Sequence, residues 1–252
     1  MNLKVVCLNI WNGELLEAAV EFLLKEMADI VLAQEVFGSE DKGLEARYRS
    51  HQIIESKLGF YSHFAPTYRD FDHTNGKALR GNSVFSRFPI IDSQVTHLSI
   101  PYNETYRDVP GNFHKCPRNL QHVKIEAFSK EINVFNVHGP WDLDGDNFND
   151  QRREMADVIM REIKDKPNII LGGDTNATPG NQAIKIIEGK LKNVFDGELK
   201  STFNMRHKTA PGYATAVVDF IFISKDVKII DKSCPDVDVS DHLPLIASLQ
   251  IS

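Results

Sequence analysis

The chain has 252 residues, of which 42% are hydrophobic and 25% charged, and its formal net charge is −6. This length and composition predict an ordinary globular protein that can fold without disulfides or a structural metal. The negative charge excludes a protein that binds nucleic acid mainly through a broad basic surface. It leaves a nuclease open, because a bound cation offsets the charge of a carboxylate-rich site.

The N-terminus and the cysteines favour a cytoplasmic location. Met1 leads almost directly into a strand pattern, without the basic region, apolar segment and cleavage site of a signal peptide. No apolar run is long enough to span a bilayer, so no membrane anchor is expected. The three cysteines, Cys7, Cys116 and Cys234, are scattered and odd in number, which agrees with a reducing compartment.

The first residues predict a strand, a helix and a second strand. Alternating, β-branched residues predict the strand at 3–10, whose end carries Asn9. Apolar residues at helical spacing predict the helix at 14–27. The strand at 29–36 is apolar until Glu35, near its end. A carboxylate there needs a metal or another cation nearby if it is buried, although a strand that simply emerges at the surface is the alternative.

The middle of the chain predicts mostly strands and long polar segments. The aromatic and basic residues of 101–117 are typical either of a substrate-contacting loop or of an ordinary long loop. The expected elements are a loop (37–45), a helix (47–58), a short strand (60–66), a loop (67–79), two strands with a turn between them (80–100), an irregular segment (101–117) and a hairpin (118–128 and 131–137).

The last part predicts helices alternating with strands. His138 ends the hairpin, where a single histidine is more often structural than catalytic. Asp219 lies within an apolar strand, where an aspartate is unfavourable without a special role. The expected elements are a helix (148–163), a strand (168–172), a short helix (181–189), a long loop (197–216) and strands at 217–224, 227–233 and 246–251.

In the stretch Gly172-Gly173-Asp174-Thr175-Asn176, two glycines end the buried strand at 168–172, and an acid and an amide follow. Glycines allow a sharp turn or the close approach of a ligand. Asp174 and Asn176 are spaced so that both side chains of an extended segment point the same way. An acid and an amide at a strand end suit a phosphate ester with a metal. The alternative is a turn that caps the following helix.

No stretch resembles a flexible linker, so residues 1–252 are predicted to form a single domain. Helices and strands alternate in both halves of the chain. We therefore expect an α/β (α+β) architecture of two mixed sheets packed face to face, with helices outside.

Several motifs, taken in order, resemble the endonuclease/exonuclease/phosphatase superfamily, whose members include DNase I, abasic-site endonucleases, neutral sphingomyelinases, inositol-polyphosphate 5-phosphatases and deadenylases. The resemblance spans essentially the whole chain and implies a four-layer α/β/β/α sandwich. The residues that carry it are Asn9, Glu35, the segment from Gly81 to Ile90, His138, Gly173-Asp174-Thr175-Asn176, Asp219 and Ser240-Asp241-His242.

The resemblance also implies a site for a divalent metal, Mg²⁺ or Mn²⁺. Glu35 would be its main ligand, with Asn9 and Asp241 close by. Oxygen ligands of this kind suit a hard cation, and the sequence has no zinc-type cluster of cysteine and histidine. In members with two ions, Asp174 and Asn176 would take part as well.

For catalysis, the resemblance implies His242 as the catalytic histidine, oriented by Asp219. His138 would match the second histidine of the DNase-like and sphingomyelinase-like branches. Asp174 or His242 would take the proton from water, and the sequence leaves this choice open. A neighbouring carboxylate would favour the charged form of His242, which would then stabilise developing charge.

Two further residues are expected at the substrate phosphate. Asn82 is a candidate donor to phosphate oxygens, and Asn176 is another. Arg118 would also reach phosphate, although an exposed arginine on a strand is the alternative.

The resulting functional prediction is a metal-dependent hydrolase of phosphodiesters, with DNA or RNA as the favoured substrate. The first alternative is a phospholipid head group, an inositol phosphate or another small phosphate ester. A noncatalytic binding protein on the same fold is the second alternative, and it would be expected to lack a metal or histidine position. Fold alone does not decide the substrate.

Overall fold

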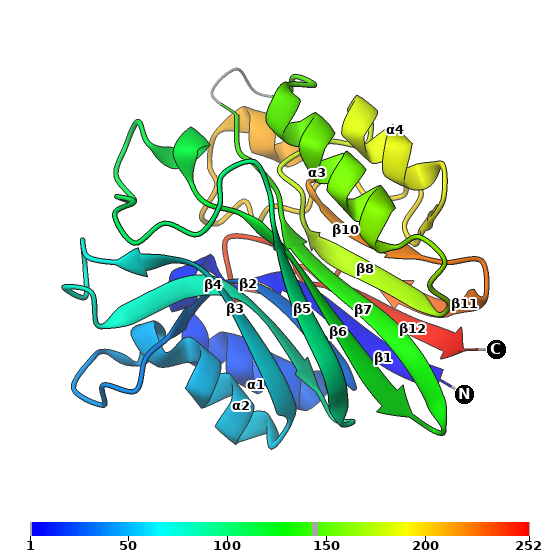
Figure 1. Cartoon of the computed structure of the whole chain (residues 1–252), viewed down its shortest axis with the longest axis horizontal. Coiled ribbons are helices and arrows are strands. Elements are labelled where there is room, and N and C mark those ends of the chain that lie inside the picture. The colour runs from blue at the N-terminus through cyan, green and yellow to red at the C-terminus, as the bar shows by residue number, and fades with distance from the viewer. Residues whose placement is uncertain (1, 143–145, 252) are drawn as a thin grey trace.

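The computed structural model describes residues 2–142 and 146–251. Two mixed, six-stranded sheets pack face to face, and helices cover their outer faces (Figure 1). This arrangement confirms the predicted four-layer α/β/β/α sandwich. That residues 1–252 form a single domain stays a prediction.

The first sheet joins strands from the two ends of the chain. In spatial order it contains β11 (Val227–Ser233), β12 (Leu245–Ile251), β1 (Asn2–Asn9), β2 (Ile30–Gly38), β4 (Ala78–Ser86) and β3 (Tyr61–Asp70). β1 runs parallel to β2 and antiparallel to β12. Because β1 and β2 are parallel, their carboxyl ends lie at the same edge of the sheet.

The second sheet is built from the middle of the chain. In spatial order it contains β5 (Ile90–His97), β6 (Asn119–Ala127), β7 (Lys130–His138), β8 (Ile169–Asp174), β10 (Asp219–Ile223) and β9 (Lys192–Asn193). β7 is parallel to β8, with His138 opposite Asp174. β10 is antiparallel to β8, with Asp219 opposite Asp174. The register therefore places these three side chains at one edge.

Helices lie outside both sheets. α1 (Leu16–Glu26) and α2 (Ser50–Leu58) cover the first sheet, whereas α3 (Asp150–Glu162) and α4 (Gln182–Glu188) cover the second (Figure 1). No helix among the described residues combines the length and the apolar character needed to cross a membrane. Single-turn 3-10 helices occur at Trp11–Gly13, Ala46–Arg49, Phe113–Lys115 and Pro211–Thr215.

Apolar side chains fill the space between the two sheets. Leu32 of β2 and Cys7 of β1 belong to the same buried cluster as Ile170 of β8 and Ile221 of β10. Both sheets are thus buried on two faces, which explains why their central strands are apolar runs rather than clean alternations.

A polar bridge crosses this apolar core. The Gln34 side chain of β2 donates from Nε2 to Oδ1 of Asn136 in β7, over 2.6 Å. The Asn136 amide donates in turn to the carbonyl oxygens of Ala33 and Ser83, at 3.0 and 3.1 Å. Since buried polar groups need partners, this bridge favours one alignment of the sheets over others.

The predicted loop at 67–79 is wrong at both ends. β3 continues to Asp70 and β4 begins at Ala78, so only the residues between them form the loop. Thr67 and Tyr68 are buried, and a bulge between Pro66 and Tyr68 keeps the strand paired with β4. The polar sequence concealed this extension, because the Thr67 hydroxyl is satisfied by the Arg80 carbonyl oxygen. The two-residue strand β9 also went unpredicted.

Candidate active site

A cleft of about 250 Å³ opens where the edges of the two sheets meet. Loops that follow the strands form its walls. Acidic, basic and aromatic side chains line it together. The lining includes Glu35, Asp108, Asp174 and Asp241, the cationic Arg80, Arg118 and Lys208, the histidines His138 and His242, and the rings of Trp11, Phe113, Trp141, Phe203 and Tyr213.

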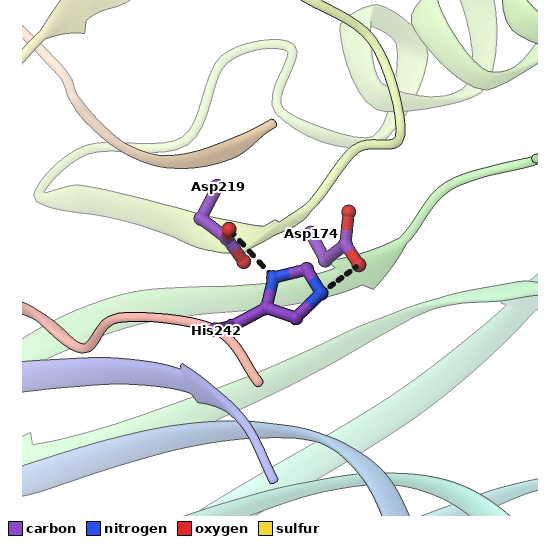
Figure 2. A group of neighbouring side chains, drawn as sticks. All are labelled: Asp174, Asp219 and His242. Carbon is purple, nitrogen blue, oxygen red and sulfur yellow. Dashed lines mark hydrogen bonds and ion pairs between the residues drawn. The ribbon is translucent and has the colours of Figure 1, made fainter. Parts of the chain in front are cut away.

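His242, which lines this cleft, lies between the carboxylates of Asp219 and Asp174 (Figure 2). Its Nδ1 atom is 2.9 Å from Oδ2 of Asp219, and its Nε2 atom is 3.9 Å from Oδ2 of Asp174. All three side chains are buried. Burial alone would lower the pKa of His242, but Asp219, Asp174 and Asp241 outweigh it and raise the pKa to about 10. At neutral pH the imidazole is therefore charged and both nitrogens donate.

Asp219 is positioned by the start of β10. Its backbone N–H and that of Val218 both donate to the Thr202 hydroxyl, at 3.3 and 3.1 Å. One carboxylate oxygen, Oδ2, bonds to His242, whereas the other, Oδ1, is buried without a hydrogen-bond partner among the described residues. The unfavourable burial of this acid is compensated mainly by the charge on His242.

Asp174 ends β8 and is the most heavily contacted acid in the site. It accepts from the Asn9 amide at 3.1 Å and from the Asn176 backbone N–H at 2.9 Å. His138 Nε2 lies 3.5 Å from its Oδ2 atom. Burial and the neighbouring Asp219 raise the pKa of Asp174 to about 6, against the opposing effect of His242. Above that pH its carboxylate is a proton acceptor.

The glycine before Asp174 is required by the backbone. Gly173 has φ +150°, and a Cβ added to it would lie 1.8 Å from the carbonyl oxygen of Val137 in β7. The close approach of the two strands puts His138 and Asp174 opposite each other. Glycine thus permits the contact on which this side of the site depends.

Glu35 has an unusual backbone. Its φ is +58°, and it lies in a bulge of β2 between Ala33 and Val36. A positive φ in a non-glycine residue is strained, and such strain is common at functional sites. Glu35 lines the cleft, where its Oε1 atom is 3.0 Å from Nη2 of Arg80. Burial opposes the charge on Glu35, but Arg80, His242 and Arg118 outweigh it and hold the pKa below its ordinary value.

Asp241 is the second carboxylate in the cleft that forms an ion pair with a basic side chain. Its Oδ2 atom is 2.7 Å from Nζ of Lys208, which the long loop at 197–216 brings into the cleft. Burial opposes the charge on Lys208, but Asp241 and Glu35 outweigh it and raise its pKa. The preceding Ser240 hydroxyl donates to the carbonyl oxygen of Asn9 at 2.6 Å, which fastens this segment to the end of β1.

His138 lies between the cationic side chain of Arg118 and the carboxylate of Asp174. Arg118 Nη1 donates to its Nδ1 atom at 3.0 Å, so the remaining proton lies on Nε2. Burial, Arg118 and Arg80 hold the pKa of His138 well below its ordinary value. His138 is therefore neutral at physiological pH, and its two nitrogens have fixed and different roles.

The two asparagines predicted at phosphate lie in different places. Asn176 lines the cleft, and its amide donates to the Gly139 carbonyl oxygen at 3.1 Å. Asn82 is buried outside the set of described residues that line the cleft, and its amide donates to Oδ1 of Asn119 at 3.0 Å. A phosphate contact by Asn82 stays a prediction, with its amide engaged elsewhere in this structure.

Comparison with known families decides the relationship that these motifs indicate. The sequence model of the Endonuclease/Exonuclease/phosphatase family matches residues 6–242. The chain belongs to this family. No curated protein matches the sequence.

Several solved structures share the fold at low sequence identity. A family member from Beutenbergia cavernae is 17% identical with a TM-score of 0.78, and the match covers 100% of this chain and 72% of that one. The human nocturnin catalytic domain is 17% identical with a TM-score of 0.70, over 100% and 94% of the two chains. A mannosyl-6-phosphatase from Bacteroides thetaiotaomicron is 19% identical with a TM-score of 0.67, over 99% and 100%. These likenesses establish the fold alone.

The residues expected to hold a metal in a member of this family fit a hard divalent cation. Glu35 and Asp241 offer carboxylate oxygens in the cleft, and each already holds a cationic side chain there. Asn9 adds an amide beside Glu35 and Asp174. Asp174, Asp219 and His242 also have ligand atoms within 4.8 Å of one another. In that group, however, His242 offers a nitrogen that is protonated at neutral pH, so the first set, with oxygen ligands alone, suits Mg²⁺ or Mn²⁺ better.

Sequence reasoning assigned no role to two residues that shape this site. Arg80 and Lys208 are the partners of Glu35 and Asp241, and both line the cleft. The only signal for Arg80 was a charged residue directly before Gly81-Asn82 at the start of a strand. Lys208 lies in a polar loop, where lysines are common, so the sequence alone does not indicate a functional role for it.

Proposed function

We propose that this family member hydrolyses a phosphoester with the help of a divalent cation, Mg²⁺ or Mn²⁺. The observation that carries the proposal is His242, held between Asp219 and Asp174 beside the carboxylates of Glu35 and Asp241. Charged groups with strongly shifted pKa values, gathered in one cleft, are typical of a catalytic site. Membership of the family supports the same class of reaction.

The chain's own residues supply the proton transfers and the charge stabilisation. Asp174, ionised above a pH of about 6, accepts a proton from the attacking water. His242, protonated at neutral pH, donates from Nε2 to the charge that develops on oxygen. Asp219 keeps the imidazole oriented and charged. The sequence left the choice between Asp174 and His242 open, and we propose Asp174 as the base.

Neutral His138 and Arg118 complete the assignment. Arg118 donates to phosphoryl oxygens, because a guanidinium matches their geometry. Its bond to Nδ1 fixes His138 with Nε2–H directed at Asp174, where it orients the acceptor. Bound at Glu35, Asp241 and Asn9, the cation would neutralise phosphoryl charge and stabilise the leaving oxygen.

For the substrate, we propose a phosphodiester in single-stranded DNA or RNA. Trp11, Phe113, Trp141 and Tyr213 line the same cleft as the cationic side chains. Aromatic rings that stack on bases, next to cations that pair with phosphates, are typical of sites for unpaired nucleotides. The net charge of −6 disfavours a broad duplex-binding surface, which supports a single strand over a duplex.

A small phosphate ester is the second candidate. The cleft volume of about 250 Å³ supports it, because such a space suits one small phosphate-bearing group. The similarity to a protein named as a mannosyl-6-phosphatase points in the same direction.

The test is hydrolysis of bis-(p-nitrophenyl) phosphate, single- and double-stranded DNA, single-stranded RNA and mannose 6-phosphate, each with Mg²⁺, with Mn²⁺ and with EDTA. Cation-dependent cleavage of single strands that is lost in His242→Ala is expected. Turnover of the small esters alone would favour the second candidate, and no turnover of any substrate would contradict the proposal. His97→Ala is the matched control, since His97 is exposed on β5.

We also propose a cytoplasmic location. Cys7, Cys116 and Cys234 are all free thiols in the structure, which agrees with a reducing compartment. Fractionation of cells that express a tagged protein checks this directly, and recovery outside the cytoplasm would contradict it.

A further inference from the structure

Each carboxylate assigned to the divalent cation is already paired with a positive side chain. Arg80 Nη2 lies 3.0 Å from Oε1 of Glu35, and Lys208 Nζ lies 2.7 Å from Oδ2 of Asp241. Both acids are largely shielded from water, with side-chain exposures of 17% and 4%. Two such carboxylates without cations would be strongly unfavourable. The two cationic side chains therefore neutralise the metal-free site.

A divalent cation and these side chains would compete for the same oxygens. A carboxylate oxygen that receives a hydrogen bond from a cation has less electron density for a second positive charge, and the two positive charges repel each other. Binding of the ion thus favours release of Arg80 from Glu35 and of Lys208 from Asp241.

Arg80 is built to change partners without leaving the cleft. Its Nε atom donates to Oδ1 of Asn12 at 2.6 Å, and its guanidinium lies 5.6 Å from the centre of the Tyr68 ring. Tyr68 is itself fixed, because its hydroxyl donates to Asp108 at 2.8 Å. With the weak bond from Nη1 to Sγ of Cys116 at 4.0 Å, these contacts keep the planar guanidinium in the cleft when Nη2 leaves Glu35.

Lys208 has a flexible side chain and comes from a loop. Its Nζ atom lies 5.6 Å from the centre of the Tyr213 ring, so a second stabilising neighbour exists besides Asp241. Nζ carries three donors, and release from Asp241 makes one of them available. Arg80, Arg118 and Lys208 line the same cleft, so all three basic side chains are close to a ligand bound there.

We propose that Arg80 and Lys208 stand in for the divalent cation in the metal-free protein and bind the phosphoryl oxygens of the substrate once the cation is present. This inference rests on the proposed function, since it requires cation binding at Glu35 and Asp241. In this proposal, the bound cation releases Arg80 from Glu35 and Lys208 from Asp241, and both side chains are then available to bind substrate.

The test uses Arg80→Gln and Lys208→Gln in the full chain, with Mn²⁺ alone and then inorganic phosphate as probes. Calorimetry should show that Mn²⁺ binds each variant about threefold to tenfold more tightly than the wild type, because a competing cationic side chain has been removed. Phosphate binding to the Mn²⁺-loaded variants should weaken by tenfold or more. In EDTA, both variants should melt at lower temperature than the wild type, and Mn²⁺ should raise their melting temperature by more.

Arg87→Gln and Lys232→Gln are the matched controls, because these residues form ion pairs with Asp29 and Glu198 outside the cleft. If Arg80→Gln does not fold, Lys208→Gln alone provides the comparison, since Lys208 is only half-buried. Weaker Mn²⁺ binding in the variants, or unchanged phosphate binding, would overturn the inference alone. Absence of Mn²⁺ binding to the wild type would overturn the proposed function and the inference with it.

Discussion

The Nδ1 atom of His242 lies 2.9 Å from Oδ2 of Asp219, and this bond joins the two sheets. His242 precedes β12 of the first sheet, whereas Asp219 begins β10 of the second. The pair determines the charge of the imidazole, because Asp219 is the main group that raises its pKa. A test of the pair is thus a test of both the chemistry and the alignment of the layers.

Asp219→Asn should lower kcat by roughly 10²- to 10⁴-fold with little effect on the fold, because it removes the charge that keeps His242 protonated. The pKa of His242 should fall from about 10 towards its ordinary value, so activity in the variant should decline at a lower pH than in the wild type. The pH profile of kcat measures this shift. Asp92→Asn is the control, since Asp92 is exposed on β5. An alkaline limb that stays in place would refute the role of Asp219.

The free energy of unfolding should fall as the pH rises from about 6.5 to about 10. The folded-state pKa of His242 is about 10, above the unfolded value of about 6.5. The stability from its charge is therefore complete below about 6.5 and is lost as the pH rises through the folded-state pKa. Urea unfolding in EDTA at a series of pH values measures this. In His242→Gln the decline should be much smaller, and an equal decline in both proteins would contradict the assigned pKa.

Asp174→Asn should reduce kcat/KM by roughly 10²- to 10⁴-fold, because an amide of the same shape does not accept the proton from water. In the wild type, activity should fall on the acid side of a pH of about 6, as Asp174 becomes protonated. A bound cation would move this limb to lower pH. Asp157→Asn, on the exposed face of α3, is the control. Near-normal turnover by purified Asp174→Asn would show that another group is the base.

Gly173→Ala should destabilise the protein by at least about 3 kcal/mol, because the added Cβ would lie 1.8 Å from the Val137 carbonyl oxygen. Gly180→Ala should change stability by less than about 0.5 kcal/mol, since nothing lies within 4 Å of a Cβ there. Urea unfolding of both variants provides the comparison. Equal stability of the two would show that β7 and β8 can move apart without penalty.

The sequence predicted the layers of this fold because the strands carry a strong local pattern. Apolar runs at β1, β2 and β8 and helical spacing at α1 and α3 each depend on neighbours in the chain. β3 shows where this reasoning ends. Its last residues are polar, and only pairing with β4 across a bulge makes them a strand.

The partners within the candidate site were harder to foresee. Two acids could be identified from the sequence. Glu35 follows an apolar run, and Asp241 lies in the Ser240-Asp241-His242 motif that carries the family resemblance. Their cationic partners Arg80 and Lys208 come from distant segments whose side chains meet only after folding. No local pattern encodes such a contact, and the same holds for the bond between Arg118 and His138.

The layered origin of the site links turnover to packing. Asn9 of the first sheet donates to Asp174 of the second at 3.1 Å, so the residues of the proposed active site are divided between two layers that meet along an apolar core. A slip of about 1 Å between the layers would slow the proposed reaction by roughly 10²-fold while leaving every strand intact. A low concentration of denaturant should therefore abolish the proposed activity before circular dichroism detects any loss of secondary structure. Activity would then report the alignment of the two sheets more sensitively than the secondary structure does.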